Sequence, residues 1–471
     1  MKYLRHISTA LILSAATFLS SCATTKPFPV YEVQRNELTE WFASAKALVE
    51  EERGLDLSNV TLSTVTGREM LFVLSDLYGK KLDPNMTADT RVRVFADKAF
   101  NDVKSVQAVY DPFAKRIVVN QQNLKYYIGL LTDRGADARD AAMTLLIHEL
   151  IHAADDQEYD LVAIEKRHKG DTLGVFMVAE GHAEMQTELL CVKAGCSSAF
   201  RTAQIEFHGA DPQDTDQILL TSSDNNGLLY VQGRTFLKAL AARDSDGSLV
   251  KQALTKPPGD VLEFFDPANF PDTQRANRRE KIYEVLNSVE IESPQGPLLK
   301  VPQAAFNESD LPAGKQQRLK YVREYKQKTL ASGSMNYIEQ HTEDMNSVYV
   351  TLYEASSPDA AYEIQQSLIG ERRELTGRLK KLGADISHPN ASKLADMSEN
   401  LPTKTQRYVV DFRNRDTGEM LQFISSFLIE GNHLIAVSNS DDNELNREAL
   451  LKTLQNPVSY THLTLPTTPY V

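Results

Sequence analysis

Cysteine is scarce in this 471-residue sequence, in which it occurs three times. Three thiols cannot complete the four-cysteine site of a zinc ribbon, so that class of structural metal site is excluded. Long basic runs are also missing, and 51 Lys and Arg against 64 Asp and Glu give a formal net charge of −13. Because attraction to the phosphate backbone requires concentrated positive charge, we expect no nucleic acid as a partner.

Long apolar runs are absent after the N-terminal segment, and no later stretch approaches the roughly 20 uninterrupted apolar residues that a membrane span needs. A multispanning membrane protein is therefore excluded. The 22 Gly and 19 Pro are scattered without a period, which is typical of an ordinary globular chain. A chain of this length predicts two or three domains, each with a core of its own.

Residues 1–21 have the basic start and the apolar core of a secretory signal peptide. The sequence Leu-Ser-Ser-Cys at 19–22 resembles the lipobox of bacterial lipoproteins. The resemblance implies cleavage before Cys22 and a diacylglycerol on its thiol. Because Ala23 is not aspartate, it also implies an outer-membrane anchor that faces the periplasm. A plain signal peptide with an incidental cysteine is the alternative. Residues 22–35 are expected to form an extended tether.

The C-terminal residues 458–471 begin with VSYTHLTLPTT, which resembles a translated sequencing-library adapter of the transposon-end type. The resemblance implies an assembly artefact rather than native protein, so His462 is not considered as a metal ligand. A short native polar tail is the alternative, and it would be equally uninformative about function.

Composition along the chain predicts two folded domains. Residues 36–292 are rich in helical patterns, and residues 293–314 contain several prolines without periodicity, which predicts an interdomain linker. Residues 315–457 alternate strand and helix patterns, which predicts a smaller α+β sandwich of a sheet against helices. The expected fold class is therefore α+β.

Periodicity and turn residues place the expected elements along the chain. In the first domain we expect helices over 36–52 and 68–78, a strand, turn and strand over 108–122, and helices from Asp137, over 171–193 and from Tyr230 to the DSDG turn. In the second domain we expect strands VYVTLYE, RYVVDFR, EMLQFISSFLIE and HLIAVSN, and helices over the segments that begin SPDAAYE and ELNREAL.

Residues His148-Glu149-Leu150-Ile151-His152 form an H-E-x-x-H motif on the helix expected from Asp137. Residues four apart lie on one face of a helix, so both imidazoles can bind one Zn²⁺ while Glu149 flanks the open coordination position. The apolar surroundings predict a core helix, in which unpaired polar groups would cost roughly 1–3 kcal/mol each. A metal would satisfy all three side chains. Two core histidines without a metal are the alternative.

A catalytic zinc takes three protein ligands and a water. The segment 178–184, VAEGHAE, is the best source of the third ligand, because Glu180 and Glu184 share one helical face. We expect Glu180 to bind the metal and Glu184 to hydrogen-bond a ligand imidazole, while His182 points elsewhere. His182 or Glu184 as the ligand, and a solvated acidic face, remain the alternatives.

Cys191 and Cys196 lie five residues apart in CVKAGC. In the oxidising periplasm they could form a structural disulfide, since Gly195 would let the chain fold back after a helix. Two free thiols are the alternative.

The sequence HELIHAADDQEYDL from His148 is similar to the HEL-x-HA-x-x-DQ-x-x-DL signature of a family of bacterial zinc peptidases of the gluzincin type. Glu180-Gly181 resembles that family's E-G-x-A segment, and YVQGRTF at 230–236 resembles its Y-x-x-G-x-x-F segment. The resemblance covers roughly residues 110–270 and implies a helix-rich, zincin-like metallopeptidase domain ahead of the smaller α+β sandwich domain.

The chain departs from that family's pattern at a few positions. Ala154 and Asp155 stand in place of the usual Leu-Gln, a change that touches packing rather than a ligand. The turns at 256–258 and 265–267 resemble later turns of the family, but Phe265 replaces the usual His. That departure leaves the substrate preference open.

The implied reaction is hydrolysis of a peptide bond: zinc lowers the pKa of its bound water toward ~7, and Glu149 takes the proton and later protonates the leaving amine. Tyr230 is the candidate that stabilises the charged intermediate. A half-buried tyrosine without a catalytic role is the alternative. His208 and Tyr110 are weaker candidates for substrate contact.

Together these patterns predict a lipid-anchored zinc metallopeptidase that acts on peptides or proteins in the periplasm. The competing hypothesis is a non-proteolytic envelope lipoprotein that uses a zincin-like fold for interaction. In the second domain His388 and His433 stand alone, so we expect that domain to bind or position a partner or substrate.

Overall fold

The computed structural model describes residues 30–82, 87–167, 173–208, 227–259, 261–293, 296–303, 324, 327–338, 347–381, 385–387, 405–413, 420–440, 449 and 452–453. The expected signal peptide, Cys22 with most of the tether, and residues 458–471 lie outside the described residues. Contacts divide the chain into two compact units. The N-terminal unit comprises the described residues up to Phe270, and the C-terminal unit comprises those after it.

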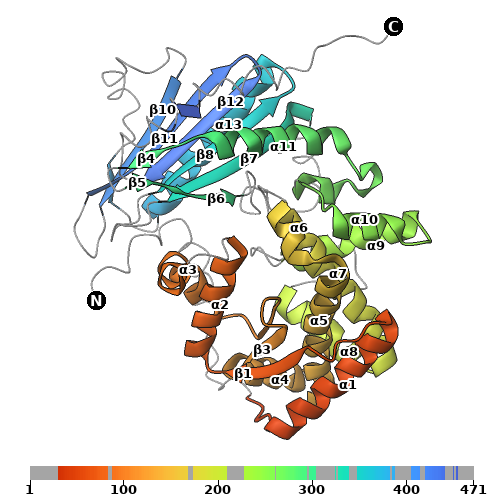
Figure 1. Ribbon diagram of the computed structural model, residues 1–471. Coiled ribbons are helices and arrows are strands. Elements are labelled where there is room, and N and C mark those ends of the chain that lie inside the picture. Colours follow the sequence, from red (N-terminus) through yellow and green to blue (C-terminus); the bar gives the residue numbers. More distant parts are fainter. Residues whose placement is uncertain are drawn as a thin grey trace. The chain divides into compact units, whose positions relative to one another are not determined.

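The N-terminal unit consists of helices with one small sheet (Figure 1). Its helices are α1 (Arg35–Arg53), α2 (Gly67–Leu82), α3 (Ala88–Asp102), α4 (Gln121–Asp133), α5 (Ala138–Tyr159), α6 (Leu161–Arg167), α7 (Leu173–Ala194), α8 (Ser197–His208), α9 (Gly233–Arg243) and α10 (Ser248–Thr255). A π-helical turn, η1 (Gly227–Gln232), leads into α9, and short 3₁₀ turns span Val261–Phe265 and Pro267–Asn269. Its strands are β1 (Thr61–Val65), β2 (Ala108–Asp111) and β3 (Arg116–Asn120).

Helix α5 forms the core of the N-terminal unit, as its apolar sequence predicts. The Asp137 side chain accepts a hydrogen bond from the backbone N–H of Arg139 and begins the helix, and Asp160 ends it in the left-handed conformation. Most of its side chains are buried, because α5 packs against α1, α4, α7 and α8. A helix that is apolar nearly all round is stable only where other elements cover every face.

The small sheet has the order β1-β3-β2, with β1 parallel and β2 antiparallel to β3. The strand, turn and strand expected over 108–122 are confirmed. In the turn, the Asp111 carboxylate accepts hydrogen bonds from the backbone N–H groups of Phe113 and Ala114, both at 3.1 Å, and Lys115 has a φ of 48°. The turn pairs β2 with β3. Strand β2 lies at the edge of the sheet and contacts α5.

The C-terminal unit is a seven-stranded antiparallel sheet of order β6-β7-β8-β12-β11-β10-β9 with helices on it (Figure 1). Its elements are α11 (Thr273–Ser288), β4 (Glu292–Ser293), β5 (Gly296–Pro297), β6 (Leu299–Gln303), β7 (Thr329–Ile338), β8 (Ser347–Ala355), α13 (Pro358–Lys381), β9 (Asp385–Ser387), β10 (Thr405–Arg413), β11 (Met420–Glu430) and β12 (His433–Ser440).

Alternate residues of a strand face opposite sides of the sheet, and here each face packs against a different helix. Val350 of β8 and Val437 of β12 lie in one core cluster with α11, whereas Tyr353 and Leu434 lie in a second cluster with α13. The coarse α+β class and a sheet packed against helices are therefore confirmed.

The division between the units lies at Phe270, earlier than the boundary expected at residue 292. Helix α11 belongs to the C-terminal unit because it packs on β7, where the Tyr337 hydroxyl donates to the Leu286 carbonyl at 2.6 Å. The prolines at 293–314 predict a linker, but part of this segment is paired in the sheet. Pro302 lies in strand β6, opposite Met335 of β7. An edge strand tolerates proline because one of its sides has no ladder partner.

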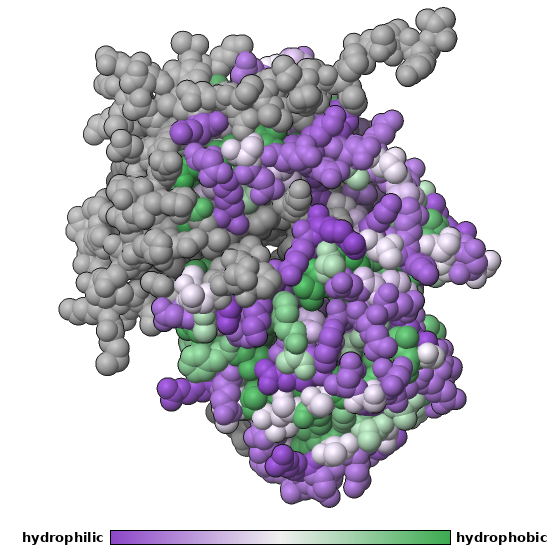
Figure 2. Space-filling model, viewed as in Figure 1, coloured by the Kyte–Doolittle hydropathy of each residue, from purple (hydrophilic) through white to green (hydrophobic). Residues whose placement is uncertain are grey.

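The surface of the described residues is largely polar. Figure 2 shows hydrophilic residues over most of the described part of the visible face, with smaller apolar areas among them. Large hydrophobic side chains that remain exposed include Phe72 and Phe100 on α2 and α3, and Leu189 and Val192 on α7. No helix among the described residues combines the length and the apolar character required to cross a membrane.

Candidate metal centre

Three donor atoms from α5 and α7 converge in the N-terminal unit. The Nε2 atoms of His148 and His152 are 3.1 Å apart, and Oε2 of Glu180 lies 3.1 Å from the first and 3.3 Å from the second. A tetrahedral zinc ion with bonds of about 2.0–2.1 Å holds its ligand atoms about 3.3 Å from one another. The donor set and its spacing therefore fit a metal ion, and the described residues contain no other such group.

The helices explain this geometry. His148 and His152 are one turn apart on α5, and Glu180 approaches from α7, which packs across α5. The two imidazole side chains are 11% and 12% exposed, and the Glu180 side chain is 21% exposed. The three side chains are therefore largely buried but retain some contact with solvent.

Glu184 lies where the sequence places it, one turn beyond Glu180 on α7. Its Oε1 is 3.3 Å from Nδ1 of His148, the ring nitrogen that does not face the donor cluster. This contact orients the imidazole so that Nε2 points toward His152 and Glu180. The second carboxylate oxygen of Glu184 accepts a 2.5 Å hydrogen bond from the side-chain amide of Gln204 on α8.

The carboxylates dominate the electrostatics of the donor cluster. Burial by itself lowers the pKa of His148, but hydrogen bonds and attraction from Glu180 and Glu184 raise that pKa well above its usual range. For Glu180, burial raises the pKa, yet the two histidines outweigh burial and lower that pKa far below its usual value. A concentration of negative charge around two imidazoles favours a bound cation.

Glu149 is a buried carboxylate beside the donor cluster, with 6% of the residue exposed. Burial raises its pKa, against the opposing attraction of His152 and His148. A hydrogen bond from the backbone N–H of Tyr110 also reaches the carboxylate. The position of Glu149 therefore depends on two elements: helix α5, to which it belongs, and strand β2, whose Tyr110 N–H donates to its carboxylate.

Tyr230 lies at the same centre, although it is 50 residues from Glu180 in the chain. Its ring centroid is 5.8 Å from that of His148, and its hydroxyl hydrogen-bonds Glu180. Burial, followed by the nearby carboxylates, raises the pKa of Tyr230 well above its usual value, so the hydroxyl keeps its proton. It belongs to the π-helical turn η1, a distortion that is frequent at functional sites.

Two glycines bring α7 and the Tyr230 segment together. A Cβ on Gly181 would lie 2.2 Å from the backbone carbon of Gly233, and a Cβ on Gly233 would lie 2.0 Å from the carbonyl oxygen of Met177. Only glycine permits such a close approach of two backbones. The glycines of the E-G and Y-x-x-G segments thus place Glu180 next to Tyr230.

His182 points away from the donor cluster, as expected from its place on α7. Its Nδ1 lies 2.7 Å from Oδ2 of Asp155, and Oδ1 of Asp155 accepts a 2.9 Å hydrogen bond from Arg53. Burial raises the pKa of Asp155, but attraction from His182 and Arg53 outweighs burial, so the net pKa is lowered. Asp155, one of the departures from the family pattern, thus joins α1, α5 and α7 and is not one of the three donor residues.

Asp156 is a residue whose structural role the sequence patterns do not reveal. Its Oδ2 accepts hydrogen bonds from the Tyr110 hydroxyl at 3.0 Å and from Lys115 Nζ at 2.6 Å. Asp156 therefore anchors the hairpin of β2 and β3 on α5, and this contact positions the Tyr110 N–H that reaches Glu149. In the sequence, Asp156 stands out only as the Asp of the Asp-Gln pair in the signature. The signature does not indicate that Asp156 contacts Tyr110 or Lys115.

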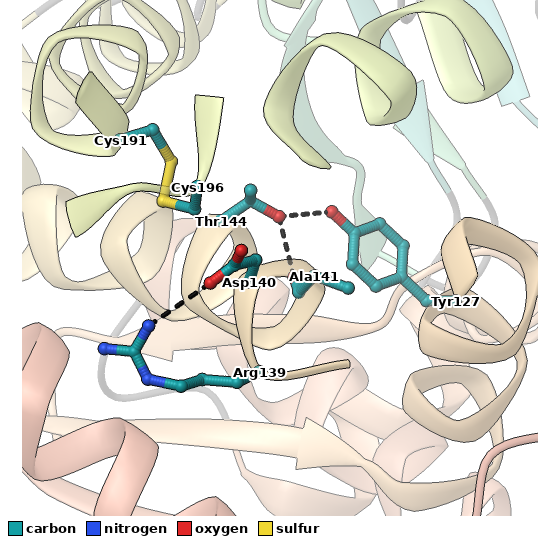
Figure 3. The surroundings of a disulfide bond; sticks show 7 residues. All are labelled: Tyr127, Arg139, Asp140, Ala141, Thr144, Cys191 and Cys196. Atoms are coloured by element: carbon teal, nitrogen blue, oxygen red, sulfur yellow. Dashed lines mark hydrogen bonds and ion pairs between the residues drawn. A yellow bond between two sulfur atoms is a disulfide. The ribbon is translucent and has the colours of Figure 1, made fainter. Parts of the chain in front are cut away.

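Cys191 and Cys196 form a disulfide. Figure 3 shows the bond beside α5, where the Tyr127 hydroxyl and Thr144 Oγ1 lie 2.7 Å apart. Both cysteines are fully buried, and the bond joins the end of α7 to the start of α8. The side chain of His208, a weaker candidate for substrate contact, lies outside the described residues, as does His388.

No protein-family model, curated protein or solved structure matches this chain.

Proposed function

We propose that the protein is a zinc-dependent metallopeptidase of the gluzincin type. The observation that supports this proposal is the convergence of two imidazole nitrogens and one carboxylate oxygen, from His148, His152 and Glu180, at the spacing of a tetrahedral site. Two histidines and a glutamate are the protein ligands of thermolysin-type zinc sites, which keep the fourth position open for water or substrate. Glu149 places a further carboxylate beside this cluster, and it is not one of the three donor residues.

The residues around the donor cluster have distinct roles in the proposed reaction. Bound zinc would supply Lewis acidity and lower the pKa of a water at its open position toward about 7. Glu149 then accepts the proton of the attacking water and passes it to the leaving amine. In the structure the Tyr230 hydroxyl hydrogen-bonds Glu180. With Glu180 on the metal, this hydroxyl would instead donate its one proton in a hydrogen bond to the carbonyl oxygen on which negative charge develops. Glu184 keeps the His148 ring in the tautomer whose Nε2 has a free lone pair.

An extended peptide is the substrate that best fits the neighbouring sheet. Strand β2 pairs with β3 on one side, and among the described residues no strand pairs with its other side. Strand β2 also donates the Tyr110 N–H to Glu149, so the edge runs beside the proposed base. A peptide backbone can add to such an edge by main-chain hydrogen bonds, which hold a scissile bond independently of side-chain identity.

The lipobox-like sequence at 19–22 leads us to propose that the enzyme is anchored through Cys22 to the outer membrane and faces the periplasm. Metabolic labelling with a radioactive fatty acid tests the anchor. We expect label in the wild-type protein and none in Cys22→Ser, and equal labelling of the two would refute it.

Metal content and hydrolysis test the proposed activity. We expect one zinc per chain by elemental analysis, and its loss in His148→Ala, His152→Ala and Glu180→Ala. Glu149→Gln should keep the fold and the zinc but lose hydrolysis of an unfolded protein such as denatured casein. Glu158→Gln is the matched control, because Glu158 lies on the same helix and pairs with Arg53 at 2.7 Å, away from the donor atoms.

The outcomes separate the two hypotheses. A folded wild-type protein that binds no zinc contradicts the metallopeptidase and favours a lipoprotein that acts by interaction. A protein that binds zinc, with Glu149→Gln as active as wild type, contradicts the role of Glu149 as the base and leaves the metal site intact.

A further inference from the structure

A line of buried polar side chains runs from α9 through α8 to the donor cluster. Nη1 of Arg234 donates a 3.0 Å hydrogen bond to Oε1 of Gln204, and Nε2 of Gln204 donates a 2.5 Å hydrogen bond to Oε2 of Glu184. Arg234 and Gln204 are each 2% exposed. Glu184 then meets Nδ1 of His148 at 3.3 Å.

The direction of each hydrogen bond follows from the chemistry of the groups. A guanidinium has donors only, so Arg234 must face the oxygen of the Gln204 amide. That choice turns the amide NH₂ toward Glu184, whose carboxylate has acceptors only. With one carboxylate oxygen taken by Gln204, the other is left to accept the Nδ1–H of His148. The lone pair of His148 is then on Nε2, the atom within the donor cluster.

We infer that Gln204 and Arg234 are positioning residues for the metal ligand His148, and that they set the orientation and tautomer of its imidazole through Glu184. The inference rests on the proposed metal site. Arg234 acts at one remove through Gln204, and neither residue contacts the donor atoms. Partners beyond the immediate ligands tune metal affinity because they fix the ligand's basicity and direction before the ion binds.

The fold holds both residues rigidly, as positioning requires. The disulfide between Cys191 and Cys196 ties the start of α8 to the end of α7 (Figure 3). Gln204 lies two turns further along α8. Arg234 follows Gly233, whose close contact with α7 fixes the start of α9. The Arg234 guanidinium also lies 5.9 Å from the Phe200 ring centroid, which covers the charge with a polarisable surface.

Zinc affinity, measured by competition with a chromophoric chelator on the full-length protein, tests the inference. We expect Gln204→Met and Arg234→Met to weaken zinc binding about 10- to 100-fold, and Glu184→Gln to weaken it at least as much. Arg234→Lys keeps one donor and should restore affinity to within about threefold of wild type. Thr187→Val is the matched control on α7: Thr187 is buried, and its hydroxyl has no hydrogen-bond partner among the described residues.

Two further measurements separate positioning from a general loss of structure. The melting temperature of the chelator-treated protein reports the stability of each variant without zinc, and only variants that melt cooperatively are compared. In the double variant Gln204→Met/Arg234→Met, the losses should not add, because Arg234 acts through Gln204. If Gln204→Met does not fold, Gln204→Glu takes its place, since glutamate still pairs with Arg234 but cannot donate to Glu184 when it is ionised.

Wild-type protein that binds no zinc overturns the proposed function. Wild-type protein that binds zinc, with folded Gln204 and Arg234 variants of unchanged affinity, overturns the positioning role alone. Losses that add fully in the double variant overturn the path from Arg234 through Gln204.

Discussion

The contact between Gly181 and Gly233 makes the sharpest prediction about the fold that supports the site. In Gly181→Ala the new Cβ would lie 2.2 Å from a backbone carbon and 2.5 Å from the backbone nitrogen of Arg234. Ordinary contacts begin at 3.4 Å, so α7 and the start of α9 must separate by about 1 Å. Neither clashing atom is in a side chain that could rotate away, so the strain must be absorbed by the backbone.

Overpacking of this kind costs about 1–3 kcal/mol, and we expect the upper part of that range because backbone atoms are involved. For a unit of this size, about 2–3 kcal/mol lowers the melting temperature by roughly 4–12 °C. Calorimetry of the metal-free protein measures this loss. Gly67→Ala is the control in the same unit, since its Cβ would meet no atom within 4 Å; we expect a change within about 0.5 kcal/mol.

The same substitution should act on the site, because Glu180 precedes Gly181 and hydrogen-bonds Tyr230 across the contact. We expect zinc affinity to fall together with stability in Gly181→Ala and to remain unchanged in Gly67→Ala. A Gly181→Ala protein as stable as wild type would falsify the close crossing of α7 and α9, and with it our explanation of how Glu180 and Tyr230 are placed.

Three other predictions follow from single contacts. Asp155→Asn removes a fully buried carboxylate from its ion pair with Arg53, whose side chain is 11% exposed, and should cost about 3 kcal/mol in urea denaturation at pH 7. Because the folded-state pKa of Asp155 is lowered, this stabilisation is complete above the unfolded pKa of about 3.9 and is lost as the pH falls through the folded pKa, so the two proteins should converge in stability at strongly acidic pH. Replacing Cys191 and Cys196 by serine opens a short loop and should cost about 2 kcal/mol in the chain-entropy model; an equal wild-type and variant melting temperature contradicts this. Tyr230→Phe should lower kcat about 10²- to 10³-fold with a smaller change in KM, whereas a change in KM alone would argue against transition-state stabilisation.

The parts of the site that could be read from the sequence are those that depend on local geometry. The two imidazoles of α5 share a face because a helix repeats every 3.6 residues, and Glu180 and Glu184 share a face of α7 for the same reason. The beginning of α5 at Asp137 follows from a capping side chain two residues from its partner. Each of these features involves residues close in the chain, so a single segment contains the whole pattern.

The parts that could not be predicted depend on contacts between distant segments. Strand β7, TLASGSMNYI, has few β-branched residues and is a strand because it is paired on both sides. The proline-containing β6 has the composition of a linker but lies at the edge of the sheet. In both cases long-range pairing outweighs local propensity.

The sequence by itself determined that this chain has a buried helix with an H-E-x-x-H motif and a second helix with two carboxylates on one face. Only the tertiary structure decided which distant residues meet. Glu180 lies 3.1 Å from His148, and Asp155 pairs with His182. Arg234 reaches Glu184 through Gln204. The physical reason is that helical periodicity specifies the direction of a side chain relative to its own axis. The distance between two axes is set by the residues at their contact, here Gly181 and Gly233, and their spacing in the sequence does not reveal that they meet.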